Sequence, residues 1–388
     1  MNKQEILLAL VRNVICGEPL DDNLISACTP EMLESVYELS VKHDLTHLVG
    51  QALSKAAVPA SDALEKCKRA AMSAFVRYMQ QNHEYTRVCA VLEEAKIPFI
   101  PLKGSVLRDY YPEAWMRTSC DADILVKEEI LDTATALLVD RLSYTAGSKT
   151  DHDITLRATT GFHLELHYDT IQERYEVNGC REILASIWEH AASRQEGSCH
   201  LWLSDEMFYF YHMAHMAKHI AVGGCGVRAF LDIWIMNHKM PHDRQKRLDM
   251  LEHGGLLQFA LAAEKLSECW FSNAEPDEMD VALSDYILRA SLYGDKANRA
   301  ALGQARNGGR LKYLLTQRVF MPYDYLKDEY PILKERKWLT PWYQVVRWMR
   351  MLRSKGGLGN TMRELKANAA SGKNEGDAAA ELLKHLGL

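Results

Sequence analysis

The sequence has no apolar run that approaches the roughly 20 residues a membrane-spanning helix needs. Its first residues, MNKQEILLALVRNVICGEPLDD, mix acidic side chains into an amphipathic helical pattern. They have neither the apolar centre nor the small-residue cleavage site of a signal peptide. Both absences argue against membrane-spanning and secreted proteins, and we expect a cytoplasmic protein.

Clustered cysteines are also absent. Nine cysteines are scattered as single residues, and none forms a C-x-x-C motif. An odd, unclustered set is typical of reduced, mostly buried thiols in a reducing compartment. One reactive thiol is the alternative, and Cys120 is its candidate because it precedes Asp121. The sequence favours the structural role, since a thiolate beside a carboxylate is disfavoured.

An excess of positive charge is absent as well. The 388 residues carry a net charge of −6, whereas a general nucleic-acid binder usually has a basic surface. The composition, 47% hydrophobic and 25% charged, is that of a soluble globular protein. The length suits two or three domains or one large α+β unit.

Helical periodicity occupies both ends of the chain. Apolar residues recur at helical spacing up to residue 95, and a second helical region follows Ser204, an expected N-cap before two acidic residues. Strand-like segments lie between them. We therefore predict an α+β protein with four parts: an N-terminal helical region (1–95), a core (96–200), a C-terminal helical region (201–355), and a polar tail with a short terminal helix (356–388).

The stretch IPFIPLKGSVLRDYYPEAWMRTSCDADILV, residues 97–126, is the most informative part of the chain. It predicts a strand at 97–103, a Lys-Gly-Ser turn, a short helix and a second strand at 121–126. The two prolines restrict the first strand to an edge or start position. A helix at 127–142 and a hairpin of strands at 154–158 and 162–168 are predicted to follow.

Asp121 and Asp123 are two residues apart on a predicted strand, so both side chains face the same way. Adjacent carboxylates repel each other unless a cation lies between them, and Mg²⁺ prefers carboxylate, water and phosphate oxygens. Two solvated aspartates are the alternative. The motif is weak alone, and the turn that precedes it makes a metal site much more plausible.

The turn itself suits a phosphate group. The backbone N–H groups of Gly104 and Ser105 would point at a phosphate, and Lys103 would pair with one of its oxygens. An ordinary strand-to-helix turn is the alternative. Arg117, just before the D-x-D strand, either reaches a triphosphate or is only a loop arginine, and the sequence leaves both roles open.

A third carboxylate lies on the last predicted strand. Glu165 shares one face with His163 and His167. It would bind a second metal ion or take the proton from an attacking hydroxyl. The polar face of an edge strand is the alternative, and three converging carboxylates favour the functional role.

The runs LKGSVLRDYYPEAWMRTSCDADILV and FHLELHYD resemble the DNA polymerase β-like nucleotidyltransferase superfamily. They are most similar to an uncharacterised bacterial family with an L-K-G turn, an arginine before a D-x-D strand and a later E-L-H strand. The similarity extends upstream to KHDLTHLVGQAL and downstream to FYHMAHMAKHI, RAFLDI and FMPYDYLKDEYPILKERKWLTPWY, so it covers most of the chain.

The resemblance implies a small mixed β-sheet core with flanking helices, Mg²⁺ or Mn²⁺ as cofactor, and an NTP as donor. It implies that Gly104 and Ser105 form the phosphate turn and that Asp121, Asp123 and Glu165 are the catalytic metal ligands. Two features depart from the family pattern. Cys120 stands where many relatives have glycine, and the spacing between the turn and the D-x-D strand is long.

The predicted reaction is attack of an acceptor hydroxyl on the α-phosphorus of an NTP, with release of pyrophosphate. The sequence does not identify the NTP or the acceptor, which would be a small molecule, a sugar, a protein hydroxyl or an RNA end. One alternative is a D-x-D glycosyltransferase using a nucleotide-sugar and Mn²⁺, which needs a nucleotide-binding fold before the D-x-D motif. Another is a non-catalytic binding or scaffold protein of the same fold.

Histidines gather on one face of a predicted helix. His212, His215 and His219 follow the spacing i, i+3, i+7. Zn²⁺ bound by these histidines and Asp232 is one interpretation. Helix packing with an Arg228–Asp232 ion pair is a second. The third is that the region lines the acceptor side of the site, with these candidates: His167, His215, Lys218, His219 and Asp232.

Overall fold

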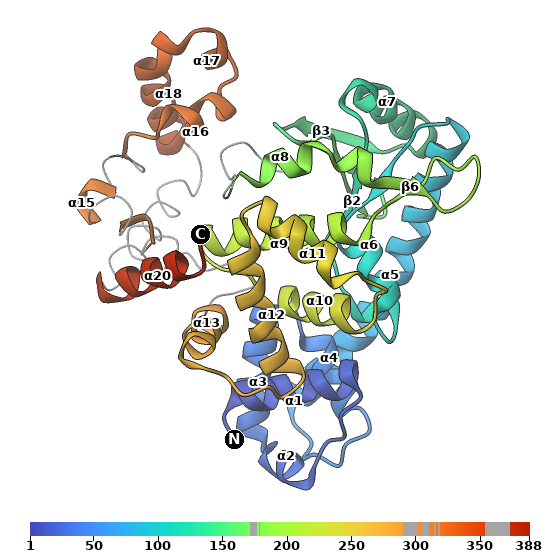
Figure 1. Cartoon of the computed structure of the whole chain (residues 1–388), viewed down its shortest axis with the longest axis vertical. Helices are drawn as coiled ribbons and strands as arrows, with labels where there is room; N and C mark the ends of the chain where they lie inside the picture. The colour runs from blue at the N-terminus through green and yellow to red at the C-terminus, as the bar shows by residue number, and fades with distance from the viewer. Residues whose placement is uncertain are drawn as a thin grey trace.

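The computed structural model describes residues 1–170, 177, 179–289, 302–304, 310–313, 316, 319–353 and 373–388. Helices come first, a five-stranded mixed sheet occupies the middle of the chain, and helices return after it (Figure 1). This order confirms the predicted α+β class with a small mixed sheet and helical flanks. The four predicted domain boundaries remain a prediction.

The N-terminal helices begin where the sequence provides caps. Asn2 and Glu5 form a capping box, Thr29 caps a helix with Pro30 in its first position, and Ser61 caps the 33-residue helix α5. The helices are α1 (Lys3–Cys16), α2 (Asp22–Ala27), α3 (Pro30–His43), α4 (Thr46–Leu53) and α5 (Asp62–Glu94). Ser61 therefore marks the start of a new helix after α4.

The sheet has the strand order β1-β2-β5-β4-β3. Its strands are β1 (Ile100–Pro101), β2 (Ala122–Leu125), β3 (Thr145–Lys149), β4 (Asp153–Arg157) and β5 (His163–His167). β2 and β5 run parallel, and the other neighbouring strands are antiparallel. The chain passes from β2 to β3 through η3 (Glu128–Ile130) and α7 (Leu131–Leu142).

The strands are shorter than the sequence predicts. The strand expected at 97–103 is only Ile100–Pro101, at the edge that its prolines require, and Phe99 makes a separate bridge to His200. The hairpin of β4 and β5 is confirmed. Sequence analysis did not predict β3, because its residues TAGSK are all exposed and show no apolar alternation.

Strand register decides which polar side chains meet. Asp123 of β2 lies beside Glu165 of β5, and Asp153 of β4 lies opposite His167 on the other side of β5. Residues two apart on a strand point to the same face, and paired residues share that face. Three adjacent strands therefore place polar groups on one side of the sheet.

Short elements connect the sheet to a group of helices. A Gly-Gly-Cys-Gly segment separates α9 from α10, and Gly223 and Gly224 have φ values of 154° and 110° that favour glycine. Ser204 precedes α9 as predicted, but its side chain makes no capping bond. The elements are α8 (Cys180–Ala185), η5 (Ile187–His190), β6 (Ala191–Ser193), β7 (Leu201–Leu203), α9 (Asp205–Val222), α10 (Val227–His238), α11 (Arg244–His253), α12 (Leu257–Phe271) and α13 (Glu278–Arg289).

The largest hydrophobic core joins helices from the two ends of the chain. Ile6 and Leu10 of α1 belong to the same buried cluster as Phe230 of α10 and Phe259 of α12. In Figure 1 the blue N-terminal helices lie beside the yellow and orange helices α12 and α13. The N-terminal helices and helices α9 to α13 thus form one packed body.

A second core lies under the sheet. Ile124 and Leu164 of the sheet pack with Val88 of α5 and Leu138 of α7. The long helix α5 runs from the N-terminal helices to the sheet (Figure 1). It therefore connects the two cores and supports the strands that carry the candidate site.

Further helices follow α13. They are α15 (Arg310–Tyr313), α16 (Tyr323–Glu329), α17 (Ile332–Glu335), η7 (Lys337–Leu339), α18 (Thr340–Arg353) and α20 (Lys373–His385). The short terminal helix predicted within 356–388 is α20, and its Leu383 is buried in the largest core, as is Leu386 just after the helix. Residues 356–372 of the predicted tail lie outside the described part of the chain. Within the described part, no helix is both long and apolar enough to cross a membrane.

Candidate active site

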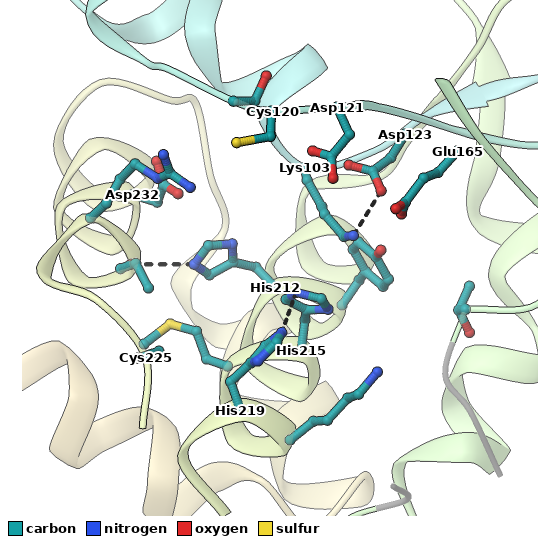
Figure 2. A pocket seen from close by; sticks show the side chains of 18 of the residues that line it. Lys103, Cys120, Asp121, Asp123, Glu165, His212, His215, His219, Cys225 and Asp232 are labelled. Atoms are coloured by element: carbon teal, nitrogen blue, oxygen red, sulfur yellow. Dashed lines mark hydrogen bonds and ion pairs between the residues drawn. The ribbon is translucent and has the colours of Figure 1, made fainter. Parts of the chain in front are cut away.

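A cavity of about 430 Å³ lies over the polar face of the sheet. Side chains from β2 and β5 line one side of it, and side chains from α9 and α10 line the other (Figure 2). The predicted site residues that line this cavity are Lys103, Gly104, Arg117, Asp121, Asp123, Glu165, His167, His215, Lys218, His219 and Asp232. Ser105 instead lines a small neighbouring hollow.

Asp123, Glu165 and His167 form a compact group in this cavity. One ligand atom from each lies within 4.8 Å of the others. Nε2 of His167 lies 2.9 Å from Oδ1 of Asp123 and 3.4 Å from Oε2 of Glu165. Asp121 is not part of this group, but it lines the same cavity, and in Figure 2 its carboxylate lies beside that of Asp123. The fold therefore brings the three predicted carboxylates to one place and adds a histidine.

Lys103 lies among these carboxylates. Its Nζ is 2.7 Å from Oδ1 of Asp123, and the side chain is 22% exposed. The residue has φ 47° and ψ −122°, a conformation that non-glycine residues rarely adopt and that costs on the order of 1–3 kcal/mol. This backbone geometry directs the side chain to Asp123 rather than along the strand.

The charges perturb one another. Burial, with the charges of Asp123 and Glu165, raises the pKa of Asp121. Burial alone would raise the pKa of Asp123, but Lys103 and His167 lower it overall. Burial lowers the pKa of Lys103, and the charge of Asp123 outweighs it and raises that pKa. Asp123 is therefore held ionised, and Asp121 is more easily protonated than an ordinary aspartate.

His167 and Glu165 shift each other in opposite directions. Burial lowers the pKa of His167, but its hydrogen bonds with Asp123 and Glu165 raise it overall. The same bond to His167 lowers the pKa of Glu165. The two side chains therefore form a coupled acid–base pair at the edge of the cavity.

The Lys-Gly-Ser turn opens α6 (Gly104–Leu107). A Cβ at Gly104 would lie 3.0 Å from Nη1 of Arg117, so glycine lets this arginine pass close to the turn. The backbone N–H of Ser105 donates to the carbonyl oxygen of Leu102 at 3.2 Å. This N–H is thus used inside the turn.

Arg117 forms a closed ion pair. Its Nε and Nη2 donate to the two carboxylate oxygens of Asp232, each at 2.8 Å, and its Nη1 donates to the carbonyl oxygen of Thr118. The hydroxyl of Tyr111 donates to Asp232 at 2.7 Å. Burial lowers the pKa of Arg117, and Asp232 raises it overall. Both partners line the cavity, but their charged groups are satisfied by each other.

The intrahelical ion pair between Arg228 and Asp232, which belonged to the packing interpretation, does not form. Nη1 of Arg228 lies 2.7 Å from Oδ2 of Asp44 and 3.0 Å from the carbonyl oxygen of Thr118. Asp232 instead accepts hydrogen bonds from Arg117, which is 115 residues away in sequence. A spacing of i, i+4 on α10 permits the pair, but long-range partners with better geometry replace it.

The three histidines of α9 do not act as one unit. Nε2 of His215 and Nε2 of His219 are 3.0 Å apart, whereas Nε2 of His212 faces the carbonyl oxygen of Ala229 at 3.4 Å. Burial lowers the pKa of His212 and strongly lowers that of His215. His215 and His219 lie across the cavity from the carboxylates in Figure 2.

The zinc interpretation of these histidines is not supported. Where His, Cys, Asp or Glu ligand atoms gather closely enough for a metal ion in the described chain, the groups contain none of the histidines of α9. Asp232, the fourth ligand that this interpretation requires, is already bound bidentately by Arg117.

Sequence analysis missed several side chains of the cavity, and three of them bear on its chemistry. His152 and Asp153 line it beside His167, and Tyr211 of α9 lies near Lys103. Hairpin register could have found Asp153, because pairing Arg157 with His163 across the turn puts Asp153 opposite His167. Tyr211 is four residues before His215 and therefore on the same helix face.

A family model described as uncharacterised nucleotidyltransferase matches residues 30–272, well over half of the chain. The chain belongs to this family. The match includes the turn, the D-x-D strand, β5 and the histidines of α9. Searches of curated proteins and of solved structures gave no match. This membership of a nucleotidyltransferase family supports nucleotidyl transfer as the general activity.

Proposed function

We propose that this nucleotidyltransferase moves a nucleoside monophosphate from an NTP to an acceptor hydroxyl and releases pyrophosphate. The observation that carries the proposal is the convergence of Asp123 and Glu165 with His167 in a cavity that also contains Asp121. Family membership favours a nucleotide as the donor. The acceptor and the choice of NTP remain open.

The donor set fits a divalent metal ion. Asp121, Asp123 and Glu165 supply the oxygen ligands that Mg²⁺ and Mn²⁺ prefer. The ammonium of Lys103 lies 2.7 Å from Asp123 and serves as a stand-in cation within the group. When bound, the metal would offset negative charge on the phosphates.

The remaining chemistry falls to side chains of this chain. Glu165 accepts the proton of the acceptor hydroxyl, and the N–H of His167 orients its carboxylate. Lys103 moves from Asp123 to a phosphate oxygen when the nucleotide enters. Its ammonium thus pairs with Asp123 in the free protein and with a phosphate in the nucleotide-bound protein. Gly104 lets the phosphates approach the turn.

The far wall of the cavity suits the acceptor. His215 and His219 lie opposite the carboxylates in Figure 2, and Lys218 of the same helix also lines the cavity. Arg117 and Asp232, closed on each other, hold that wall rather than contact the triphosphate. We therefore propose that the strands bind the donor and that α9 binds the acceptor.

The test uses each of the four NTPs, labelled at the α-phosphate, with cell extract and Mg²⁺ or Mn²⁺. We expect metal-dependent label in one acceptor class, and no label with Asp123→Asn. Calorimetry should show that NTP binds the wild type better with metal than without. Equal metal–nucleotide binding by wild type and Asp123→Asn would refute the assignment of the site.

One observation favours a second candidate, a non-catalytic binding protein of the same fold. Lys103 already neutralises Asp123, as a lysine would if it had replaced a metal ion permanently. In that case NTP binding would be independent of metal, and no acceptor would be labelled. A glycosyltransferase is disfavoured, because helices rather than a nucleotide-binding fold precede the D-x-D strand.

A further inference from the structure

A second polar group lies on the β4 side of the candidate site. His152, Asp153 and His167 each offer one ligand atom, and these atoms lie within 4.8 Å of one another. Asp153 is opposite His167 in the β4–β5 ladder, and His152 immediately precedes it. The rings of His152 and His167 have centroids 5.6 Å apart. All three residues line the cavity.

The two nitrogens of His167 have very different surroundings. Nε2 lies against the carboxylates of Asp123 and Glu165, which can only accept, so Nε2 carries a proton. Nδ1 is buried, since the whole residue is only 3% exposed, and it has no hydrogen-bond partner among the residues that the structure describes. A buried imidazole nitrogen without a partner is costly, so a ligand for it is expected.

His152 repeats this pattern. Its Nδ1 lies 3.0 Å from Oδ1 of Asp151 and 2.9 Å from Oγ1 of Thr150, and its Nε2 lies 3.4 Å from Oδ2 of Asp153. The hydroxyl of Thr150 also donates to Oδ1 of Asp153 at 2.6 Å. The ring of His152 therefore has the carboxylate of Asp151 at one nitrogen and that of Asp153 at the other.

Metal-binding histidines are usually arranged in this way, with one nitrogen on the ion and the other N–H on a carboxylate that fixes the ring. Two imidazoles and one carboxylate form a three-ligand set with room for a water or substrate oxygen. Imidazole ligands suit zinc and its neighbours, whereas Mg²⁺ prefers oxygen ligands alone.

We propose that His152, Asp153 and His167 bind a divalent transition-metal ion, for which Zn²⁺ is the probe. This site is separate from the Mg²⁺ or Mn²⁺ ligands Asp121, Asp123 and Glu165, and His167 lies between the two. An ion on Nδ1 of His167 keeps the proton on Nε2, and thus fixes the ring against Asp123 and Glu165. The inference stands on ligand geometry and does not require the proposed reaction.

The experiment measures Zn²⁺ binding to untagged, metal-stripped protein in excess Mg²⁺, by competition with a chromophoric chelator and by elemental analysis. We expect one Zn²⁺ per chain in the wild type. His152→Ala and Asp153→Asn should weaken it on the order of 100-fold. His163→Ala is the matched control, because His163 lies on the same strand and face outside the group. His219→Ala tests the neighbouring pair on α9, and both controls should retain the ion.

A second measurement does not depend on the variants folding. Long-range proton–nitrogen spectra of wild-type imidazoles should show Zn²⁺ shifting one nitrogen in each of two rings, with the partner nitrogen still protonated. Absence of stoichiometric Zn²⁺ in the wild type would overturn the proposal. So would equal affinity in wild type and Asp153→Asn, or loss of the ion in His219→Ala instead.

Discussion

Asp123 and Asp232 are both buried, at 3% and 1% exposure, both line the cavity, and each meets a cation. The pairs differ in construction. Asp232 has both oxygens bound by the guanidinium of Arg117 and a further hydroxyl bond from Tyr111. Asp123 meets the single ammonium of Lys103 and the ring of His167, both through Oδ1.

The difference indicates what each carboxylate can do. A bidentate guanidinium pair has fixed geometry and leaves no oxygen for a ligand. An ammonium is a compact charge on a flexible stem, so it can be exchanged for another cation. Asp232 is therefore suited to hold the cavity wall, and Asp123 to hold a cation that changes during the reaction.

The largest expected effect is the loss of stability when the ion pair between Arg117 and Asp232 is broken. Arg117→Met leaves Asp232 buried without its cation, which should lower the free energy of unfolding by about 3–5 kcal/mol. Urea denaturation measures it. Arg228→Met is the control, because its partner Asp44 is 36% exposed, and it should cost about 1 kcal/mol or less. Similar losses in both variants would contradict the distinction.

A pair of isosteric variants separates chemistry from stability. Asp123→Asn should lower the single-turnover transfer rate on the order of 10³-fold, because it removes charge at the reacting centre. Asp232→Asn should lower the urea midpoint but leave the rate per folded molecule within a few-fold of wild type. If Asp232→Asn instead keeps the midpoint and loses the rate, Asp232 belongs to the acceptor site.

The exchange at Asp123 has its own test. Lys103→Met removes the competing ammonium, so Mn²⁺ should bind the nucleotide-free protein on the order of 10-fold tighter. This corresponds to about 1.4 kcal/mol of binding free energy. NTP affinity should fall in the same variant if the ammonium moves to a phosphate. Lys218→Met is the control for charge alone. Unchanged Mn²⁺ affinity in Lys103→Met would mean that the ammonium and the metal do not share a position.

The smallest expected effect is on the pH dependence of stability. It concerns two buried histidines, His167 and His43, whose pKa values shift in opposite directions. The pKa of His167, which lies near Asp123, is raised by its hydrogen bonds with carboxylates. Burial lowers the pKa of His43 to about 4. The ring of His43 lies against the backbone of Leu288 and Val227. A histidine with a lowered folded pKa binds fewer protons than the unfolded chain between about pH 4 and 6.5. Stability therefore falls as pH falls through this window.

His43→Gln should remove part of that acid sensitivity. Between pH 7.5 and 5.5 the wild type should lose about 1 kcal/mol more than the variant. Denaturation at the two pH values measures the difference. An identical loss in both proteins would show that other groups account for the acid sensitivity.

Local sequence patterns predicted much of the site. The D-x-D strand, the turn before it and the alternation around Glu165 depend on neighbouring residues, so they can be read directly. The same holds for the Gly-Gly-Cys-Gly break between α9 and α10. These features located the carboxylates and the family before any distance was known.

Pairings across the chain could not be predicted in this way. Arg117 finds Asp232 115 residues away, and Arg228 finds Asp44 184 residues away, so no spacing rule favours these partners over nearer ones. The direction of Lys103 depends on a backbone conformation that its sequence neighbours do not require. The shared core of the two helical regions is another such long-range result.

That shared core has a consequence for synthesis on the ribosome. Arg12 of α1 donates to the carbonyl oxygen of Trp270 at the end of α12, 258 residues later. At typical elongation rates α1 waits on the order of 10–50 s for this partner. During that interval the apolar side of α1 that α12 will cover is exposed, so newly made chains depend on holding factors or on transient packing among α1, α3 and α4. Chains that stop before α12 should therefore aggregate more readily than full-length chains, even though the strands of the candidate site have already been made.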